Sequence, residues 1–156
     1  MPQPPEFIHH LGLSPLPVEG GLFAQSWRSA EGSAIYYLLV APQFSAPHRL
    51  DRTEVFVHHA GSAARMLLLH PEGSSEGSSS GTVTRPVLGP DVAAGERPQV
   101  VVPAGTWQAT VPLGEWCLLG TVVVPPYTDD CVEFADVETL AARFPAAAAD
   151  LRALPR

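Results

Sequence analysis

Histidine and carboxylate side chains gather in one stretch, APHRLDRTEVFVHHAG (residues 46–61), which holds three of the six histidines. If its apolar part forms a strand, alternate side chains share a face, so Glu54, Phe56 and His58 point to the same side. His48 would lie on the inner surface of a facing strand. A histidine and a carboxylate that converge inside a protein can transfer protons or, with a second histidine, bind a first-row metal ion.

Seven short runs are rich in branched and aromatic residues: one lies within this stretch, and the other six surround it and must position it. They are separated by glycine, proline, serine and aspartate, as is typical of strands joined by turns. The runs are LFAQSW, AIYYLLVA, TEVFVHHA, ARMLLLH, QVVVPA, TWQATV and WCLLGTVVV. Because no helical pattern lies between them, they predict an antiparallel sandwich or barrel.

Helical patterns occur near the two ends of the sequence. EFIHHLG (residues 6–12) predicts a short helix with glycine as its stop signal. DVETLAARF (136–144) begins with an aspartate N-cap and ends before Pro145, which predicts a second helix. Segment 71–86 is rich in serine and glycine and has the composition of a flexible loop.

Length and composition limit the class of protein. With 156 residues and 46% hydrophobic content, the chain suits one domain over residues 1–156, with a core at about 18–134. Two cysteines are too few for a disulfide framework, and the N-terminus shows neither a signal-peptide pattern nor a long apolar span. We therefore expect a cytoplasmic protein that does not bind membranes.

The charge pattern limits the partners and the chemistry. The formal net charge is -7, and the nine positive residues are scattered arginines. This pattern offers no basic stripe for nucleic acid. Because the chain has no lysine, Schiff-base chemistry and a P-loop are excluded. A small-molecule partner is the expectation that remains.

Two motifs resemble those of the cupin superfamily. The first family motif is G-x5-H-x-H-x3,4-E-x6-G, and His48, Glu54 and Gly61 follow its spacing, with Leu50 at the second histidine. The second is G-x5-P-x-G-x2-H-x3-N, which is similar to PAGTWQ here, with Gln108 at the histidine. The resemblance implies an all-β double-stranded β-helix, the cupin jelly roll, with half of the usual metal ligands replaced.

A closer resemblance is to the small cupins of the DUF985 or Cupin_5 group. It rests on the runs EGGLFAQSWRS, SAIYYLL, HRLDRTEVF, VVPAGTW and FADVETLAARFP, which cover nearly the whole chain in order. The chain departs from the group at Val57, His58 and His59, where a histidine and two aromatic residues are expected, and at Gln108, where an aromatic residue is usual. The resemblance also implies a homodimer, since cupins commonly pair through their sheets.

The cupin fold also includes metal-free sugar-nucleotide epimerases, which use an interior histidine as base and a tyrosine as acid. By this resemblance we expect an isomerase or epimerase without a cofactor, acting on a sugar-like or hydroxy-acid substrate. His48 would be the base, Glu54 its partner and Tyr127 the acid, with Tyr37 as a second candidate acid. The residues expected to bind substrate are Trp27, Tyr37, Phe56, His58, Trp107 and Gln108.

Other functions stay open at this stage. A metal-dependent oxygenase or lyase would take its divalent first-row metal ion from His48, Glu54, His58 and Gln108, although a neutral amide oxygen is a poor ligand for such ions. A non-catalytic pocket for a small metabolite is a further alternative. His48 and Glu54 could also form a buried pair that only fastens two strands, but burying such a pair costs several kcal/mol unless it is well compensated.

Overall fold

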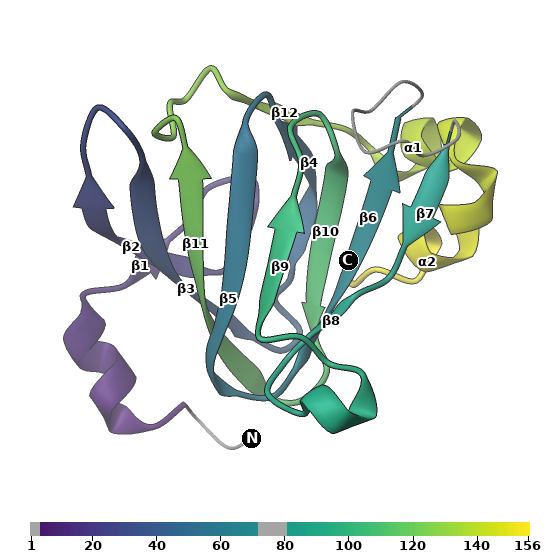
Figure 1. Ribbon diagram of the computed structural model, residues 1–156. Coiled ribbons are helices and arrows are strands. Elements are labelled where there is room, and N and C mark those ends of the chain that lie inside the picture. Colours follow the sequence, from purple (N-terminus) through teal and green to yellow (C-terminus); the bar gives the residue numbers. More distant parts are fainter. Residues whose placement is uncertain (1–3, 72–80) are drawn as a thin grey trace.

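Two antiparallel β-sheets pack face to face in the computed structural model, which describes residues 4–71 and 81–156 (Figure 1). Sheet A has the strand order β1-β2-β3-β11-β5-β9, and sheet B has the order β12-β4-β10-β6-β7, with β8 paired to β6. The strands of sheet A are β1 (Ser14–Pro15), β2 (Leu22–Arg28), β3 (Ser33–Val40), β5 (Thr53–Gly61), β9 (Gln99–Val102) and β11 (Trp116–Val124). Those of sheet B are β4 (Ser45–Leu50), β6 (Ala64–His70), β7 (Thr82–Thr84), β8 (Val87–Leu88), β10 (Trp107–Pro112) and β12 (Val132–Phe134). The predicted antiparallel sandwich is confirmed.

The alternation of side chains along each strand separates an inner face from an outer face. On β11, Cys117 and Leu119 point inward and are fully buried, as is Leu39 on the neighbouring β3. On β6, Met66 and Leu68 meet them from sheet B. This apolar core fills the space between the sheets, and burial of its side chains is the main driving force that holds them together.

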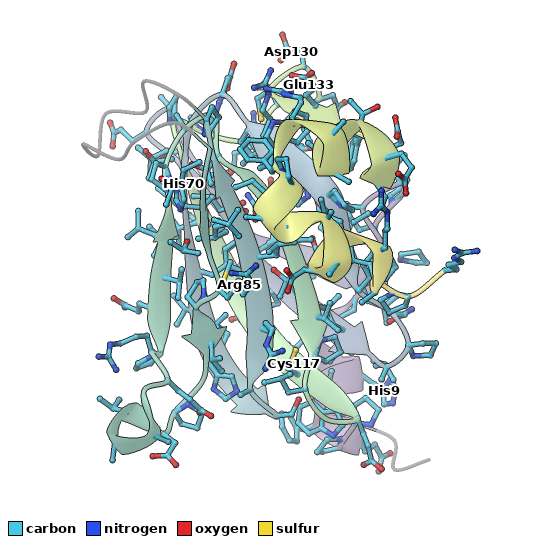
Figure 2. All side chains as sticks on the ribbon, turned by 90° about the vertical axis from the view of Figure 1, so that its right-hand side faces the viewer. His9, His70, Arg85, Cys117, Asp130 and Glu133 are labelled. Carbon is cyan, nitrogen blue, oxygen red and sulfur yellow. The ribbon has the colours of Figure 1, made fainter. Side chains whose placement is uncertain are left out.

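Helical segments cover parts of both outer faces. The 3-10 helix η1 (Glu6–Leu11) buries Ile8 against Leu38 and Leu118 on the outside of sheet A. On the outside of sheet B lie α1 (Val137–Arg143), η3 (Pro145–Ala147) and α2 (Ala148–Arg152), in yellow in Figures 1 and 2. Leu140 and Leu151 from these helices pack on Leu67 and Leu69 of β6.

The start of α1 follows from local chemistry. The Asp136 side chain accepts a hydrogen bond from the backbone N–H of Thr139 at 2.9 Å, which satisfies one of the donors that every helix N-terminus leaves free. This is the helix that the sequence predicts over 136–144. The short helix η2 (Val92–Ala94) lies between β8 and β9 and begins with the same kind of cap, from Asp91.

The expected loop over 71–86 differs from the structure at its C-terminal end. Residues 72–80 of that segment lie outside the described residues. Thr82–Thr84 form β7, which pairs with β6, so these residues are not loop as predicted. Thr82, Val83 and Thr84 are β-branched residues that favour strands, and pairing with the edge of β6 lets them extend sheet B. Across residues 4–71 and 81–156, no helix has both the length and the apolar character needed to cross a membrane.

Candidate active site

A cavity of about 80 Å³ lies between the two sheets, on the side where β2, β3, β11 and β5 face β4. Its walls combine apolar side chains such as Phe23 and Ile35 with a larger set of polar ones. The polar lining residues are Glu19, Gln25, Ser33, Tyr37, His48, Glu54, Thr121 and Tyr127. The structure thus places in one cavity the four residues expected to carry the chemistry, His48, Glu54, Tyr37 and Tyr127.

The chain path explains why His48 and Glu54 share this cavity. His48 lies on β4 of sheet B and Glu54 near the start of β5 in sheet A, and both side chains are buried. Only Asp51 and Arg52 connect the two strands, so the chain crosses from one sheet to the other between the two residues. Each side chain then points inward from its own sheet toward the same space.

Hydrogen bonding fixes the tautomer of His48. Its Nδ1 lies 2.7 Å from the backbone oxygen of Ala46. Because a carbonyl oxygen can only accept, Nδ1 must carry a proton, and Nε2 is the unprotonated nitrogen of the neutral ring. The nearest acidic oxygen to Nε2 is Oε1 of Glu19, at 3.7 Å, which is longer than a hydrogen bond. Nε2 can therefore accept a proton from a bound molecule.

Glu19 is a lining residue that the sequence reasoning did not single out. Its Oε1 accepts a hydrogen bond from Ser45 Oγ at 2.8 Å. The side chain comes from the segment between β1 and β2, where Val18 has a φ of 67° and the backbone N–H of Glu19 bonds Pro17 O at 2.8 Å. Such a γ-turn around a β-branched residue is strained. The two glycines after Glu19 signal an unusual turn here, but not the direction of the side chain.

Burial, aided by the nearby Glu19, raises the pKa of the Glu54 carboxyl to about 7, although a protonated His48 and hydrogen bonds from Gln108 and Thr121 act in the opposite direction. Gln108 Nε2 donates to Glu54 Oε1 at 2.8 Å. Near neutral pH this carboxyl can therefore both hold and release a proton. Groups with a pKa close to the working pH are suited to proton transfer.

The two tyrosines of the cavity differ in their hydrogen bonding. The Tyr37 hydroxyl donates to the backbone oxygen of Gly20 at 2.6 Å, so its proton is already engaged. Within the part of the chain that the structure describes, the Tyr127 hydroxyl has no hydrogen-bond partner. Burial, together with nearby acidic groups, raises the pKa of Tyr127 to about 12. Tyr127 is therefore a protonated donor with a free hydroxyl at neutral pH.

Three of the aromatic residues expected to bind substrate lie elsewhere. Trp27 does not line the cavity and is 45% exposed. Phe56 is buried in the core between the sheets and does not line the cavity. Trp107 packs under the C-terminal helices, on the outside of sheet B. Because Gln108 points inward to Glu54, alternation along β10 sends Trp107 to the opposite face.

His58 and Gln108 also depart from the expected lining. His58 Nε2 lies 3.0 Å from the backbone oxygen of Ser62, near the far end of β5, and its side chain does not line the cavity. Next to it the pairing of β5 with β11 shifts, since Leu118 opposes Ala60 and Leu119 opposes His58. Gln108 contacts Glu54 from behind but does not line the cavity itself.

The structure does not bring together the four metal ligands proposed from the sequence, His48, Glu54, His58 and Gln108. His58 is bonded to a backbone oxygen away from the cavity, and Gln108 turns its amide nitrogen, not its oxygen, toward Glu54. Among residues 4–71 and 81–156, no group of three or more His, Cys, Asp or Glu side chains is placed to hold a metal ion. The donor set does not fit a first-row metal centre.

Comparison with solved structures places this fold among double-stranded β-helix proteins, one of which is an uncharacterized protein from Klebsiella pneumoniae. A protein from Shewanella oneidensis is 34% identical, with a TM-score of 0.85, over 100% of this chain and 99% of that chain. A hypothetical protein from Leishmania major is 24% identical, with a TM-score of 0.85, over 97% and 98%. A dTDP sugar isomerase from Desulfovibrio desulfuricans G20 is 19% identical, with a TM-score of 0.54, over 79% and 80%.

The family comparison covers most of the chain. No protein with a curated description matches the sequence. The model of the Cupin_5 family, described as Cupin superfamily (DUF985), matches residues 5–135, which include every residue that lines the cavity. The chain therefore belongs to the Cupin_5 (DUF985) family of the cupin superfamily.

Proposed function

We propose that the protein is a metal-free enzyme that transfers a proton on a small substrate, as an isomerase or epimerase of a sugar-like or hydroxy-acid compound. The observation that carries the proposal is the fixed ring of His48, whose Nδ1 bonds Ala46 O and whose Nε2 is left as a base in a cavity. A positioned imidazole of this kind is the commonest general base in enzymes.

The reaction that this arrangement supports begins at a C–H bond next to a carbonyl group. His48 Nε2 takes the proton, and the electron pair of the C–H bond moves into the C–C bond as the carbonyl oxygen becomes an enol or enolate oxygen. The Tyr127 hydroxyl can stabilise that oxygen by a hydrogen bond or by donating its proton. Return of a proton to the other face of the same carbon gives the epimer. Delivery of the proton to the former carbonyl carbon, with loss of the O–H proton from the hydroxyl on the first carbon as that carbon becomes the new carbonyl, gives the isomer.

The size of the cavity indicates how much of a substrate takes part. A cavity of about 150 Å³ holds benzene, so the space of about 80 Å³ here suits a group of roughly three or four heavy atoms. It would receive the reacting end of a larger molecule. The likeness to a sugar isomerase concerns the fold alone, so the proposal rests on the cavity and its side chains.

Proton transfer can be tested without knowledge of the natural substrate. The protein is incubated in D₂O with a panel of small aldoses, ketoses and hydroxy acids, and NMR follows loss of the C–H signals. We expect exchange with at least one compound, and a fall of about 100-fold or more in His48→Gln, because removal of a general base typically costs that much. His9→Gln is the control, since His9 is exposed on η1.

A non-catalytic binding protein for a small metabolite is the second candidate, supported by the same partly open cavity with its mainly apolar surface. It predicts saturable binding of a panel compound with no exchange in the wild type. Exchange that persists unchanged in His48→Gln would refute the role of the histidine as base.

A further inference from the structure

We infer that the cavity accepts the uncharged, hydroxyl-bearing part of its ligand and rejects carboxylate and phosphate groups. The inference takes the cavity as the substrate site, so it rests on the proposed function, and it narrows the substrate class to neutral polyol or sugar-like groups. The residue that imposes the selection is Glu19.

Apart from His48, which is a cation only when its ring is protonated, the charged groups of the lining are acidic. Glu19 and Glu54 contribute carboxyl groups, and of the described residues no arginine lines the cavity. The chain contains no lysine. Arg28 and Arg52 lie beside the segment that carries Tyr127, but they donate to backbone oxygens, Tyr127 O and Pro126 O, at 2.6 Å each. An anion in the cavity would therefore be desolvated beside carboxyl groups, with no permanently charged cation to offset it while the His48 ring is neutral.

The Glu19 carboxylate cannot easily move out of the way of an anion. The backbone oxygen of Glu19 accepts from Ala46 N at 2.8 Å, and the next carbonyl, that of Gly20, accepts from Tyr37 Oη at 2.6 Å. The side chain itself is held by Ser45. A Cβ at Gly20 would lie 2.6 Å from Phe44 O, so the segment is also packed tightly against its neighbour. The carboxylate is thus a fixed part of the wall.

The hydrogen-bonding character of the wall matches hydroxyl groups. Carboxylate oxygens and the unprotonated Nε2 of His48 are acceptors, each oxygen with two lone pairs, so they are satisfied by O–H donors on a ligand. Apolar side chains such as Phe23, Ile35 and Val123 complete the wall. A carbon skeleton with hydroxyl groups presents both kinds of surface.

The two carboxyl groups do not require a cationic ligand. Ser45 donates a neutral O–H to Glu19, and Gln108 donates a neutral N–H to Glu54. Buried polar groups that already have partners of this kind gain little from an added ion pair, because the ion must first be desolvated. This favours a neutral ligand over an ammonium compound of the same shape.

Three probes with one three-carbon skeleton test the inference by NMR titration of the full chain: glycerol, which is neutral; D-glycerate, which is an anion; and serinol, a cation in which an ammonium group replaces the central hydroxyl. Chemical shifts of the His48 and Tyr127 ring signals report binding. We expect glycerol to bind at least tenfold more tightly than D-glycerate, and more tightly than serinol. In Glu19→Gln the ratio of glycerol to D-glycerate affinity should fall toward one.

Glu115→Gln is the matched control. It makes the same change of charge at an exposed position just before β11, whose cavity residues Thr121 and Val123 lie at the other end of the strand. The affinity ratio should keep its wild-type value there. Thermal unfolding monitored by circular dichroism verifies that both variants are folded.

Several results would overturn the inference: equal or tighter binding of D-glycerate, tighter binding of serinol, no binding of glycerol, or a ratio unchanged in Glu19→Gln. Its failure can be told apart from that of the proposed function. Deuterium exchange on a hydroxy acid would uphold proton transfer and refute the charge selection. Selective binding of glycerol by a protein that catalyses no exchange on any panel compound would uphold the charge selection and refute proton transfer.

Discussion

Gln108 on β10 donates a hydrogen bond to Glu54 on β5 at 2.8 Å, and so joins the two sheets behind the cavity. Both side chains are almost completely buried, and the amide oxygen of Gln108 has no partner among the described residues. A buried carboxyl group with one amide donor and one hydroxyl donor, that of Thr121, is only partly compensated for the loss of water. This explains in structural terms why burial dominates the raised pKa of Glu54.

Stability should depend on pH through Glu54. Because its pKa rises from 4.5 to about 7 on folding, the folded state binds more protons than the unfolded state between these values, and stability falls as pH rises through this window. The groups that face Glu54 are Glu19, His48, Gln108 and Thr121. Between about pH 5 and about pH 8, ionisation of Glu54 should lower the free energy of unfolding by about 2 kcal/mol.

Glu54→Gln isolates this contribution. Urea unfolding of wild type and variant at the two pH values gives four free energies of unfolding. As pH rises, the free energy of unfolding of the variant should increase by about 2 kcal/mol relative to that of the wild type, because the amide cannot ionise. A difference between the two proteins that is the same at both pH values would show that Glu54 titrates normally.

The segment that holds Glu19 should be sensitive to a methyl group at Gly20. Gly20 has a φ of 96°, and an added Cβ would lie 2.6 Å from Phe44 O. Gly95 has the same φ, of 96°, but nothing within 4 Å. Gly95→Ala should cost about 1 kcal/mol, for the backbone conformation alone, and Gly20→Ala about 3 kcal/mol, because the clash adds to it. Thermal or urea unfolding measures both, and equal losses would contradict the close approach.

Val18 should be replaceable by glycine with a gain in stability. Its φ of 67° is strained for a β-branched residue, and its side chain is 75% exposed, so few contacts are lost. Relief of about 1 to 3 kcal/mol of strain exceeds the added entropy of an unfolded glycine, which leaves a net gain of about 1 kcal/mol. Val92→Gly, at an exposed position where φ is not positive, should instead destabilise. Urea unfolding that shows a loss at both positions would refute the strain at Val18.

Trp107 should matter for stability and not for ligand binding. Its ring is 1% exposed and is flanked by the guanidinium group of Arg49 at 4.6 Å and that of Arg143 at 5.9 Å. Trp107→Phe should cost about 1 to 2 kcal/mol in unfolding free energy, for lost packing and cation–π contact. The affinity for glycerol should stay at the wild-type value. A tenfold weaker affinity would show that Trp107 contributes to ligand binding.

The sequence allowed the strands and the direction of Glu54 to be predicted because a period of two is built into any strand. The same rule shows why the expectation for Trp107 failed. Trp107 and Gln108 are neighbours, so they cannot both face the cavity, and the inward place belongs to Gln108. His58 could not be placed in this way, since the shift in pairing between β5 and β11 depends on contacts between distant segments.

Glu19 could not have been found from periodicity at all. It lies between two strands, and the direction of its side chain depends on the positive φ of Val18. It also depends on two backbone hydrogen bonds of Glu19, which accepts from Ala46 N and donates to Pro17 O. Valine gives no local signal for such a conformation, because it is among the residues that adopt it least readily. Only the tertiary contacts with β3 and β4 impose it.

The positions of Arg28 and Arg52 suggest how a substrate with an acidic tail could still use the protein. Both guanidinium groups bind the backbone beside Tyr127, at the edge of the cavity and not inside it. A molecule too long for the cavity would extend past Tyr127 toward these two guanidinium groups, of which that of Arg52 is also paired with Asp51 at 2.7 Å. The neutral end of such a molecule would react in the cavity while its acidic tail bound the arginines. These two roles are separated because the fold places carboxyl groups in the cavity and guanidinium groups outside it.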